Sequence, residues 1–321
     1  MHIKQIIIWG HYLHSHTHSY IHNAFYKSFR YLGYDTYWFD DNTDVSQFNF
    51  ENSLFISEHQ VDYNIPKRDD CLYFIHFIDK TRYADVPVSN IINLKCAFRD
   101  TKRDIKSKIC NNVVPVNNNN LEFYTTIDDI LVYYMLWGTD LLPYEIQNNI
   151  DNIKNIQKKR TRTINFIGTL TEPFHILYLF CNKNNIQFNK YGATFNINNK
   201  NNKSVEDNVN LIQESYIAPS FQNQLQVKDS YIPCRIFKNI SYGRMSATNN
   251  HIVYSLFNNK IIYDSDINNC ILKSINFESL DESERINIIS GLMYFVKDNH
   301  TFVNRINVMK EFINNHTTFS I

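Results

Sequence analysis

Residues 2–33 read HIKQIIIWGHYLHSHTHSYIHNAFYKSFRYLG, and this stretch decides the fold class. The β-branched run that ends at Trp9 predicts a buried strand. Apolar residues then recur every three or four positions, which predicts one face of a helix ending near Gly33; they are Ile21, Phe25, Phe29 and Leu32. The apolar run at residues 34–39, YDTYWF, predicts a second strand. The stretch therefore predicts a strand–helix–strand unit with a histidine-rich loop after its first strand.

The same alternation continues along the 321-residue chain. The runs NSLFISE, CLYFIHFI and NIINLKCAF predict further strands of the same layer. After residue 160 the pattern starts again, with a strand that ends at Gly168 and a helix at EPFHILYLFCNKNN, and residues 133–160 are the expected hinge.

Two repeats of this plan predict an α/β protein of two Rossmann-like domains that face each other across a cleft. We expect residues 1–155 to form an N-terminal, acceptor-side domain and residues 156–300 to form a C-terminal domain that binds a nucleotide-sugar. Residues 301–321 are expected to form a C-terminal helix that packs back toward the first domain.

Charge and composition exclude several classes of protein. The 32 basic residues balance the 32 acidic ones, which argues against a nucleic-acid-binding protein with a basic surface. The six cysteines are scattered without a CxxC pair, so neither a zinc knuckle nor a disulfide framework is expected. No run approaches the roughly eighteen apolar residues of a membrane span. We expect a cytoplasmic protein without a transmembrane segment.

The segment PCRIFKNISYG at residues 233–243 predicts a helix with two cations near its start. Arg235 and Lys238 lie three residues apart, on the face opposite to the apolar side chains. The helix macrodipole disfavours cations there by a few tenths of a kcal/mol up to about 1 kcal/mol, whereas a bound anion would reverse that effect. Two solvated surface cations would explain the same pattern, so the helix alone leaves both interpretations open.

The longer segment PSFQNQLQVKDSYIPCRIFKNISYG, residues 219–243, resembles the donor-binding segment of GT-B glycosyltransferases. It is especially similar to the α1,3-fucosyltransferase pattern, in which Ser-Phe-Glu-Asn-Ser precedes Asp-Tyr-(Ile/Val)-Thr-Glu-Lys-Leu-(Trp/Phe) and a later glycine. The matching positions are Ser220, Phe221, Asn223, Tyr231, Ile232, Arg235, Phe237, Asn239 and Gly243. The chain departs from the pattern at Gln222, which replaces a glutamate, and at Pro233-Cys234, which replace Thr-Glu. Lys238 stands where retaining GT-B enzymes usually carry a donor-binding glutamate.

Two more segments resemble spore-maturation-type glycosyltransferases. LWGTDLLPYEI at residues 136–146 is similar to their interdomain crossing, and DNHTFVNRINVMKEFI at residues 298–313 is similar to their closing helix. The resemblance implies a hexosyl- or deoxyhexosyltransferase that moves a sugar from a nucleotide diphosphate donor to a hydroxyl of a glycan or glycoconjugate. The donor would be a GDP- or UDP-sugar, with GDP-fucose among the candidates, and no metal or other cofactor would be required.

The resemblance also implies a donor site in the second domain. The expected donor-binding residues are Gly168, Thr169, Asn223, Tyr231, Arg235, Lys238 and Asn239. Arg235 and Lys238 would hold the diphosphate, because cations and a helix N-terminus can stabilise such a leaving group without a metal.

Three interpretations compete for the histidines at positions 11, 14, 16, 18 and 22. They could form the metal site of a metal-dependent hydrolase, completed by His76 and Asp79 from another strand end. They could be ordinary polar residues of a loop that caps the following helix. The loop could instead line the cleft, where one histidine acts as base on the acceptor hydroxyl or binds the donor phosphates. An imidazole with a pKa near neutrality suits abstraction of a proton.

We favour the third interpretation, with His16 as the catalytic base and His14 or His18 as alternatives. Glu58, His59 or Asp79 would supply the base if none of these three does. A non-catalytic nucleotide- or sugar-binding protein on the same fold is the alternative to an enzyme.

Overall fold

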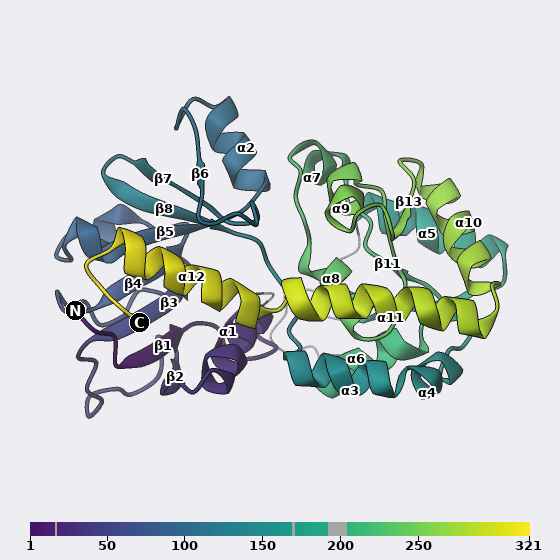
Figure 1. Ribbon diagram of the computed structural model, residues 1–321, viewed down its shortest axis with the longest axis horizontal. Coiled ribbons are helices and arrows are strands. Elements are labelled where there is room, and N and C mark those ends of the chain that lie inside the picture. The colour runs from purple at the N-terminus through teal and green to yellow at the C-terminus, as the bar shows by residue number, and fades with distance from the viewer. Residues whose placement is uncertain (17, 169–170, 192–203) are drawn as a thin grey trace. The chain divides into compact units, whose positions relative to one another are not determined.

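A computed structural model describes residues 1–16, 18–168, 171–191 and 204–321. The chain forms two compact units (Figure 1): unit 1 is Met1–Asp140 with Phe302–Ile321, and unit 2 is Leu141–Thr301. The division falls after Asp140 rather than after residue 155, because helices α3 (Pro143–Asp151) and α4 (Ile153–Lys158) pack on α11 (Glu282–Asn299) of unit 2. The division lies within residues 133–160, the expected hinge, between the end of β8 at Met135 and the start of α3 at Pro143.

An eight-stranded sheet in the order β2-β1-β3-β4-β5-β8-β7-β6 forms the centre of unit 1. The strands from β2 to β8 in that order run parallel, and β7 and β6 run antiparallel to their neighbours. The strands are β1 (Gln5–Trp9), β2 (Thr36–Phe39), β3 (Ser53–Glu58), β4 (Leu72–His76), β5 (Ile91–Cys96), β6 (Val114–Pro115), β7 (Phe123–Ile127) and β8 (Ile130–Met135). The runs expected as strands in the first half are thus confirmed as β1 to β5. Tyr133 and Tyr134, expected in the hinge, lie in β8 and are buried.

The strand order of this sheet reverses between β1 and β3. The chain leaves β1 toward β2 on one side and returns on the other side with β3. Open α/β sheets bind ligands outside the carboxyl ends of their strands at such a reversal. The fold therefore marks the end of β1 and the end of β3 as the place to look for a site.

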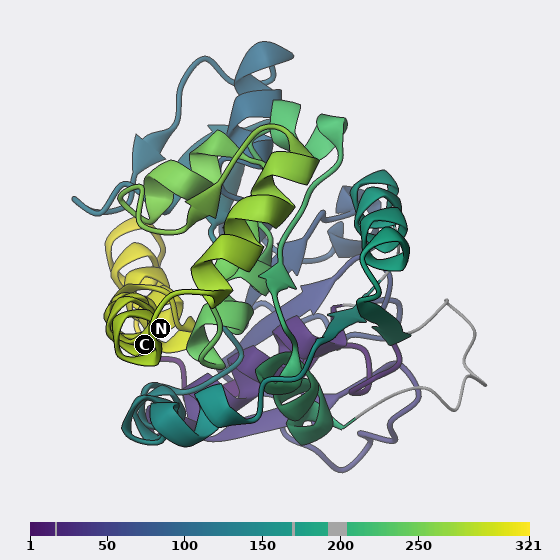
Figure 2. The same cartoon turned by 90° about the vertical axis from the view of Figure 1, so that its right-hand side faces the viewer.

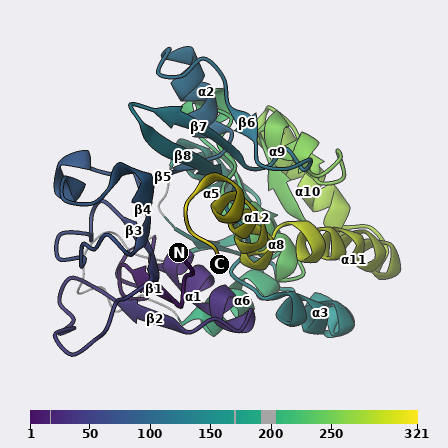
Figure 3. The same ribbon diagram turned by 60° about the vertical axis from the view of Figure 1, so that its left-hand side comes forward.

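Helices α1 (Ser19–Tyr31) and α12 (Phe302–His316) pack together on unit 1 (Figure 3). Phe25 and Phe29 of the expected apolar face are buried, and the Phe25 ring meets Phe302 edge-on with centroids 4.9 Å apart. Phe312 contacts Phe74 of β4. Unit 1 also contains η1 (Lys80–Tyr83), η2 (Val88–Asn90) and α2 (Arg99–Lys106).

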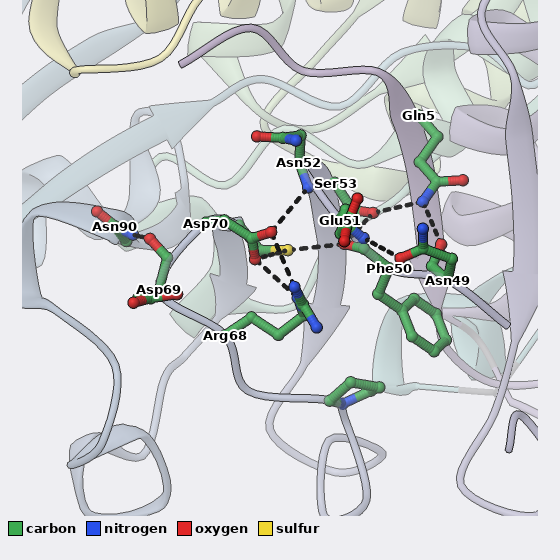
Figure 4. Close-up of polar contacts among 12 residues, drawn as sticks. Gln5, Asn49, Phe50, Glu51, Asn52, Ser53, Arg68, Asp69, Asp70 and Asn90 are labelled. Carbon is green, nitrogen blue, oxygen red and sulfur yellow. Dashed lines mark hydrogen bonds and ion pairs between the residues drawn. The ribbon is translucent and has the colours of Figure 1, made fainter.

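Polar side chains at the amino ends of the strands of unit 1 pair with one another (Figure 4). Gln5 Nε2 donates to the Asn49 carbonyl at 2.7 Å and to Ser53 Oγ at 3.0 Å. Arg68 and Asp70 form two parallel hydrogen bonds of 2.7 and 2.9 Å. Because these groups satisfy each other, this end of the sheet has a structural role.

Unit 2 contains short parallel strands with helices on both sides (Figure 2). The strands are β9 (Thr163–Ile167), β10 (Gln187–Tyr191), β11 (Ala218–Pro219), β12 (Ser246–Thr248) and β13 (Ile262–Tyr263). The helices not yet named are α5 (Glu172–Lys183), α6 (Val205–Glu214), α7 (Gln224–Lys228), α8 (Cys234–Ser241), α9 (His251–Leu256) and α10 (Ile267–Glu278). Helix α8 confirms the helix expected at residues 233–243. No helix in the described ranges is long and apolar enough to cross a membrane.

Gly10, directly after β1, makes room for the imidazole of His22. A Cβ atom at position 10 would lie 2.1 Å from His22 Nδ1, and His22 is buried. We expect Gly10→Ala to lower the free energy of unfolding by about 1–3 kcal/mol, because overpacking forces the ring or the backbone to move. Urea unfolding would measure the change.

Gly291 provides the control, since it lies inside α11 with no atom within 4 Å of an added Cβ. Gly291→Ala should raise the free energy of unfolding by up to about 1 kcal/mol. The double variant Gly10→Ala/His22→Ala should cost less than the sum of its two single changes. Strict additivity would show that the two residues do not compete for space.

Candidate functional site

A cluster of histidines surrounds one glutamate at the carboxyl ends of β1, β3 and β4. Glu58 is the last residue of β3 and His76 is the last residue of β4, and the two are direct partners in the parallel register. The loop after β1 adds His11, His16 and His18. The cluster therefore lies where the strand order reverses, at the end of the sheet that binds ligands in open α/β folds.

Glu58 is 1% exposed and is contacted by histidines on both carboxylate oxygens. Oε1 lies 2.6 Å from His11 Nε2, and Oε2 lies 2.5 Å from His18 Nδ1. His16 Nδ1 is farther away, 3.7 Å from Oε1. Neither short contact has the geometry of a hydrogen bond, so both oxygens lack one within the described part of the chain.

The surroundings of these groups shift their pKa values. Burial alone would raise the pKa of Glu58, but the close approach of His11 and His18 outweighs it and holds that pKa below its usual range. Burial lowers the pKa of His22 to about 3. Burial, followed by a neighbouring imidazole, also lowers the pKa values of His16 and His76. At neutral pH the site thus combines an ionised carboxylate with imidazoles that are held neutral.

The structure separates the three histidines predicted as candidate bases. His16 and His18 face Glu58. His14 has a φ of 72°, and its Nδ1 lies 3.1 Å from the hydroxyl of Tyr20. His14, His16 and His18 alternate with small polar residues in the sequence, so the sequence cannot distinguish them. Their different contacts appear only in the folded loop.

The sequence did not reveal the central position of Glu58, which was expected only as a substitute base. The pattern that could have indicated it is a polar residue at the end of an apolar strand. His76, considered as a distant ligand, does join the cluster, whereas Asp79 caps η1 and accepts a hydrogen bond from Thr81 N at 3.1 Å.

Unit 2 carries a second arrangement, at the carboxyl end of β9. Arg235 Nη2 donates to the carbonyl of Ile167 at 3.1 Å, and the guanidinium lies 4.6 Å from the centre of the Phe166 ring. Gly168 has a φ of 139°, and a Cβ atom there would lie 2.5 Å from Arg235 Nη2. Glycine is therefore required at this turn by both backbone conformation and space.

The charge of Arg235 has no carboxylate beside it among the residues that the structure describes. Burial lowers the pKa of Arg235; the side chains of Cys234 and Tyr231 oppose that shift, whereas no Asp or Glu of the described residues contributes to it. Lys238 follows one turn later on α8 and is half-buried. Thr169, predicted to bind the donor together with these residues, lies outside the described residues.

Two other predicted donor-binding side chains are used inside the fold. Asn239 Nδ2 donates to the carbonyl of Ala218 at 2.8 Å and to Ser246 Oγ at 3.1 Å, which links β11 to β12. Asn223 caps α7 by accepting a hydrogen bond from Gln226 N at 2.9 Å.

The last predicted donor-binding residue is Tyr231. Its carbonyl accepts a hydrogen bond of 2.8 Å from Nε2 of Gln222. Gln222 stands where the α1,3-fucosyltransferase pattern has a glutamate.

The two α/β units define the GT-B fold class and confirm the expected fold. Among solved structures the chain is similar to an α,α-trehalose-phosphate synthase (UDP-forming) from Burkholderia xenovorans, in complex with glucose-6-phosphate. The TM-score is 0.50 at 10% identity, and the match covers 92% of this chain and 79% of that chain. At this identity the likeness shows the fold alone, and it adds nothing to the resemblance to α1,3-fucosyltransferases. No protein-family model and no curated protein matches the sequence.

The low pKa of His22 predicts a pH-dependent stability. Its pKa is 6.5 in the unfolded chain and about 3 in the folded one, so below pH 6.5 only the unfolded chain takes up this proton. The stabilisation is complete above pH 6.5 and is lost as the pH falls toward 3, by about 1.4 kcal/mol per pH unit for one histidine. Urea unfolding between pH 5 and 7, with EDTA present, would measure the slope.

His22→Gln should reduce the slope of the free energy of unfolding against pH by the contribution of one proton, about 1.4 kcal/mol per pH unit. His2→Gln is the control, because His2 is an exposed histidine of the same unit. If His22→Gln left the slope unchanged, burial of a neutral His22 would not be the cause.

Proposed function

We propose that the protein is a glycosyltransferase that moves a sugar from a nucleotide diphosphate donor to a hydroxyl acceptor. The GT-B fold supports this proposal, since the similar solved structure is that of a UDP-forming synthase. The observation that carries it is Arg235, a cation without an acidic partner in the described part of the chain, seated on the glycine turn after β9.

A nucleoside diphosphate would complete this arrangement. Its oxygens carry the negative charge that develops on the leaving group, and a guanidinium can bind two of them at once. Arg235 is the second residue of α8, so the first backbone N–H groups of that helix lie beside the cation. Gly168 lets the guanidinium of Arg235 lie directly against the backbone of the turn. Lys238 would add a second cation one turn along the helix.

The acceptor hydroxyl must lose a proton during transfer, and we assign that step to His16. Its side chain is 18% exposed, and burial keeps its pKa below 6.5, so the imidazole is ready to accept a proton at neutral pH. His14 is bonded to Tyr20, which makes it the weaker candidate.

Calorimetry against UDP, GDP, CMP and dTDP, followed by their sugar conjugates, tests the proposal. We expect one nucleoside diphosphate to bind, and Arg235→Ala to weaken that binding by about 10- to 150-fold through loss of a charge-assisted contact. Arg235→Ala should also lower stability by about 1 kcal/mol, because the guanidinium lies over Phe166.

Arg162→Ala is the matched control, an exposed arginine just before the amino end of the same strand. It should leave nucleotide affinity unchanged. No binding of any nucleotide by the wild type would remove the support for a glycosyltransferase. Nucleotide binding without transfer to a glycan array or donor hydrolysis would identify a non-catalytic binding protein instead.

The base is tested by kinetics once a donor is known. His16→Ala should keep donor affinity while kcat falls by about two to four orders of magnitude. In the wild type the rate should rise with pH through an apparent pKa at or below 6.5, and this limb should be absent from the variant. His14→Ala serves as the control; a larger loss there than in His16→Ala would reverse the assignment.

A further inference from the structure

We propose that the cluster in unit 1 binds a divalent first-row transition-metal ion, with His18, Glu58 and His76 as its protein ligands. This site goes beyond the proposed glycosyl transfer and does not depend on it. The sequence predicts that no metal is needed to stabilise the diphosphate in unit 2. The ion proposed here lies in unit 1 and has no part in that step.

The three side chains have the spacing of a ligand set. One ligand atom from each lies within 4.8 Å of the others. Donor atoms around a tetrahedral ion with bonds of about 2.0–2.1 Å lie roughly 3.3 Å apart. The 2.5 Å contact between His18 and Glu58 would have to open by about 0.8 Å, and the widest pair would have to close by at most about 1.5 Å. Rotations of side chains cover such distances.

The unsatisfied atoms of the cluster point to a missing partner. Both oxygens of Glu58 and Nδ1 of His18 are buried without a hydrogen bond in the described structure. His18 Nδ1 approaches Oε2 to 2.5 Å without the geometry of a hydrogen bond. A buried carboxylate without donors costs several kcal/mol. An ion between the ring nitrogen and the carboxylate would satisfy both groups.

The ligands come from rigid elements. Glu58 and His76 are neighbours across β3 and β4, so the sheet fixes their separation. His18 is the N-cap residue of α1, and its ring stands at 81° to that of His76 with centroids 5.0 Å apart. A small pocket lined by all three, together with His22 and Trp137, lies beside them. Two imidazoles and one carboxylate suit Zn²⁺ and similar ions, and leave a position open for a water or substrate oxygen.

A second group of three, His11, His16 and Glu58, is a weaker set. His16 Nδ1 accepts a hydrogen bond of 3.3 Å from the backbone N–H of His18 and lies 3.7 Å from Glu58 Oε1. As a metal ligand, His16 would have to give up that bond, whereas His18 Nδ1 and both Glu58 oxygens make no hydrogen bond in the described structure.

The experiment uses the full chain, stripped with a chelator and titrated with Zn²⁺ and Co²⁺ by calorimetry, with elemental analysis of the dialysed protein. We expect one ion per chain. Glu58→Gln and His76→Gln should each weaken binding at least about 100-fold, because each removes a ligand. His14→Gln and His16→Gln are matched controls from the same loop and should bind within about threefold of wild type. No nucleotide is present, so failure here leaves the donor proposal untouched.

Three results would overturn the site: no stoichiometric binding by the wild type, unchanged binding in Glu58→Gln, or loss of binding in His16→Gln but not in His76→Gln. Should a variant fail to fold, X-ray absorption of the Zn²⁺-loaded wild type still decides. It should show a nitrogen and oxygen shell with imidazole scattering. A sulfur shell would place the ion on a thiol instead, such as Cys96, whose Sγ lies 3.9 Å from His76 Nε2.

Discussion

The burial of one carboxylate constrains the whole carboxyl end of the unit 1 sheet. Glu58 is 1% exposed at the end of a central strand, where an isolated charge is costly. His11 and His18 approach it to 2.6 and 2.5 Å, which fixes both ends of the loop after β1. The start of α1 is thereby fixed as well, and the His22 ring lies against Gly10, where an added Cβ would come 2.1 Å from Nδ1. The buried charge of Glu58 thus constrains the position of the loop after β1, the start of α1 and the space beside Gly10.

The topology explains why that charge lies at this end of the sheet. The connection after β1 runs toward β2, and the connection that enters β3 runs the opposite way across the sheet. Neither connection therefore covers the space between the carboxyl ends of β1 and β3. At the amino ends, by contrast, Gln5 pairs with Ser53, and Arg68 pairs with Asp70 (Figure 4). Polar residues occur at both ends of the sheet, and those at the reversal include buried atoms without a hydrogen bond in the described structure.

Local patterns made much of the fold predictable. The apolar run before Gly10, the helix face with Phe25 and Phe29, and the helix at 233–243 each depend on residues close in sequence. The pairing of Glu58 with His76 is a matter of strand register, which no local pattern encodes. The same limit applies to Tyr133 and Tyr134, at the start of the expected hinge, because they become strand residues only through pairing with β5 and β7. The sequence therefore indicated the histidine loop, but it did not indicate that Glu58, expected only as a substitute base, lies at the centre of the cluster.

Other buried charges in this chain show why Glu58 and Arg235 stand out. Arg305 and Glu122 are both buried, but they pair at 3.0 Å. Arg244 is equally buried and donates to the carbonyl of Gln213 at 2.7 Å. Such charges belong to the fold, because the chain supplies their partners. Glu58 has only imidazoles beside it, not a permanent cation, and Arg235 has no Asp or Glu beside it in the described structure. Each therefore retains a free-energy cost that a ligand of opposite charge would remove. The signs differ: a cation suits the site in unit 1, and an anion suits the site in unit 2.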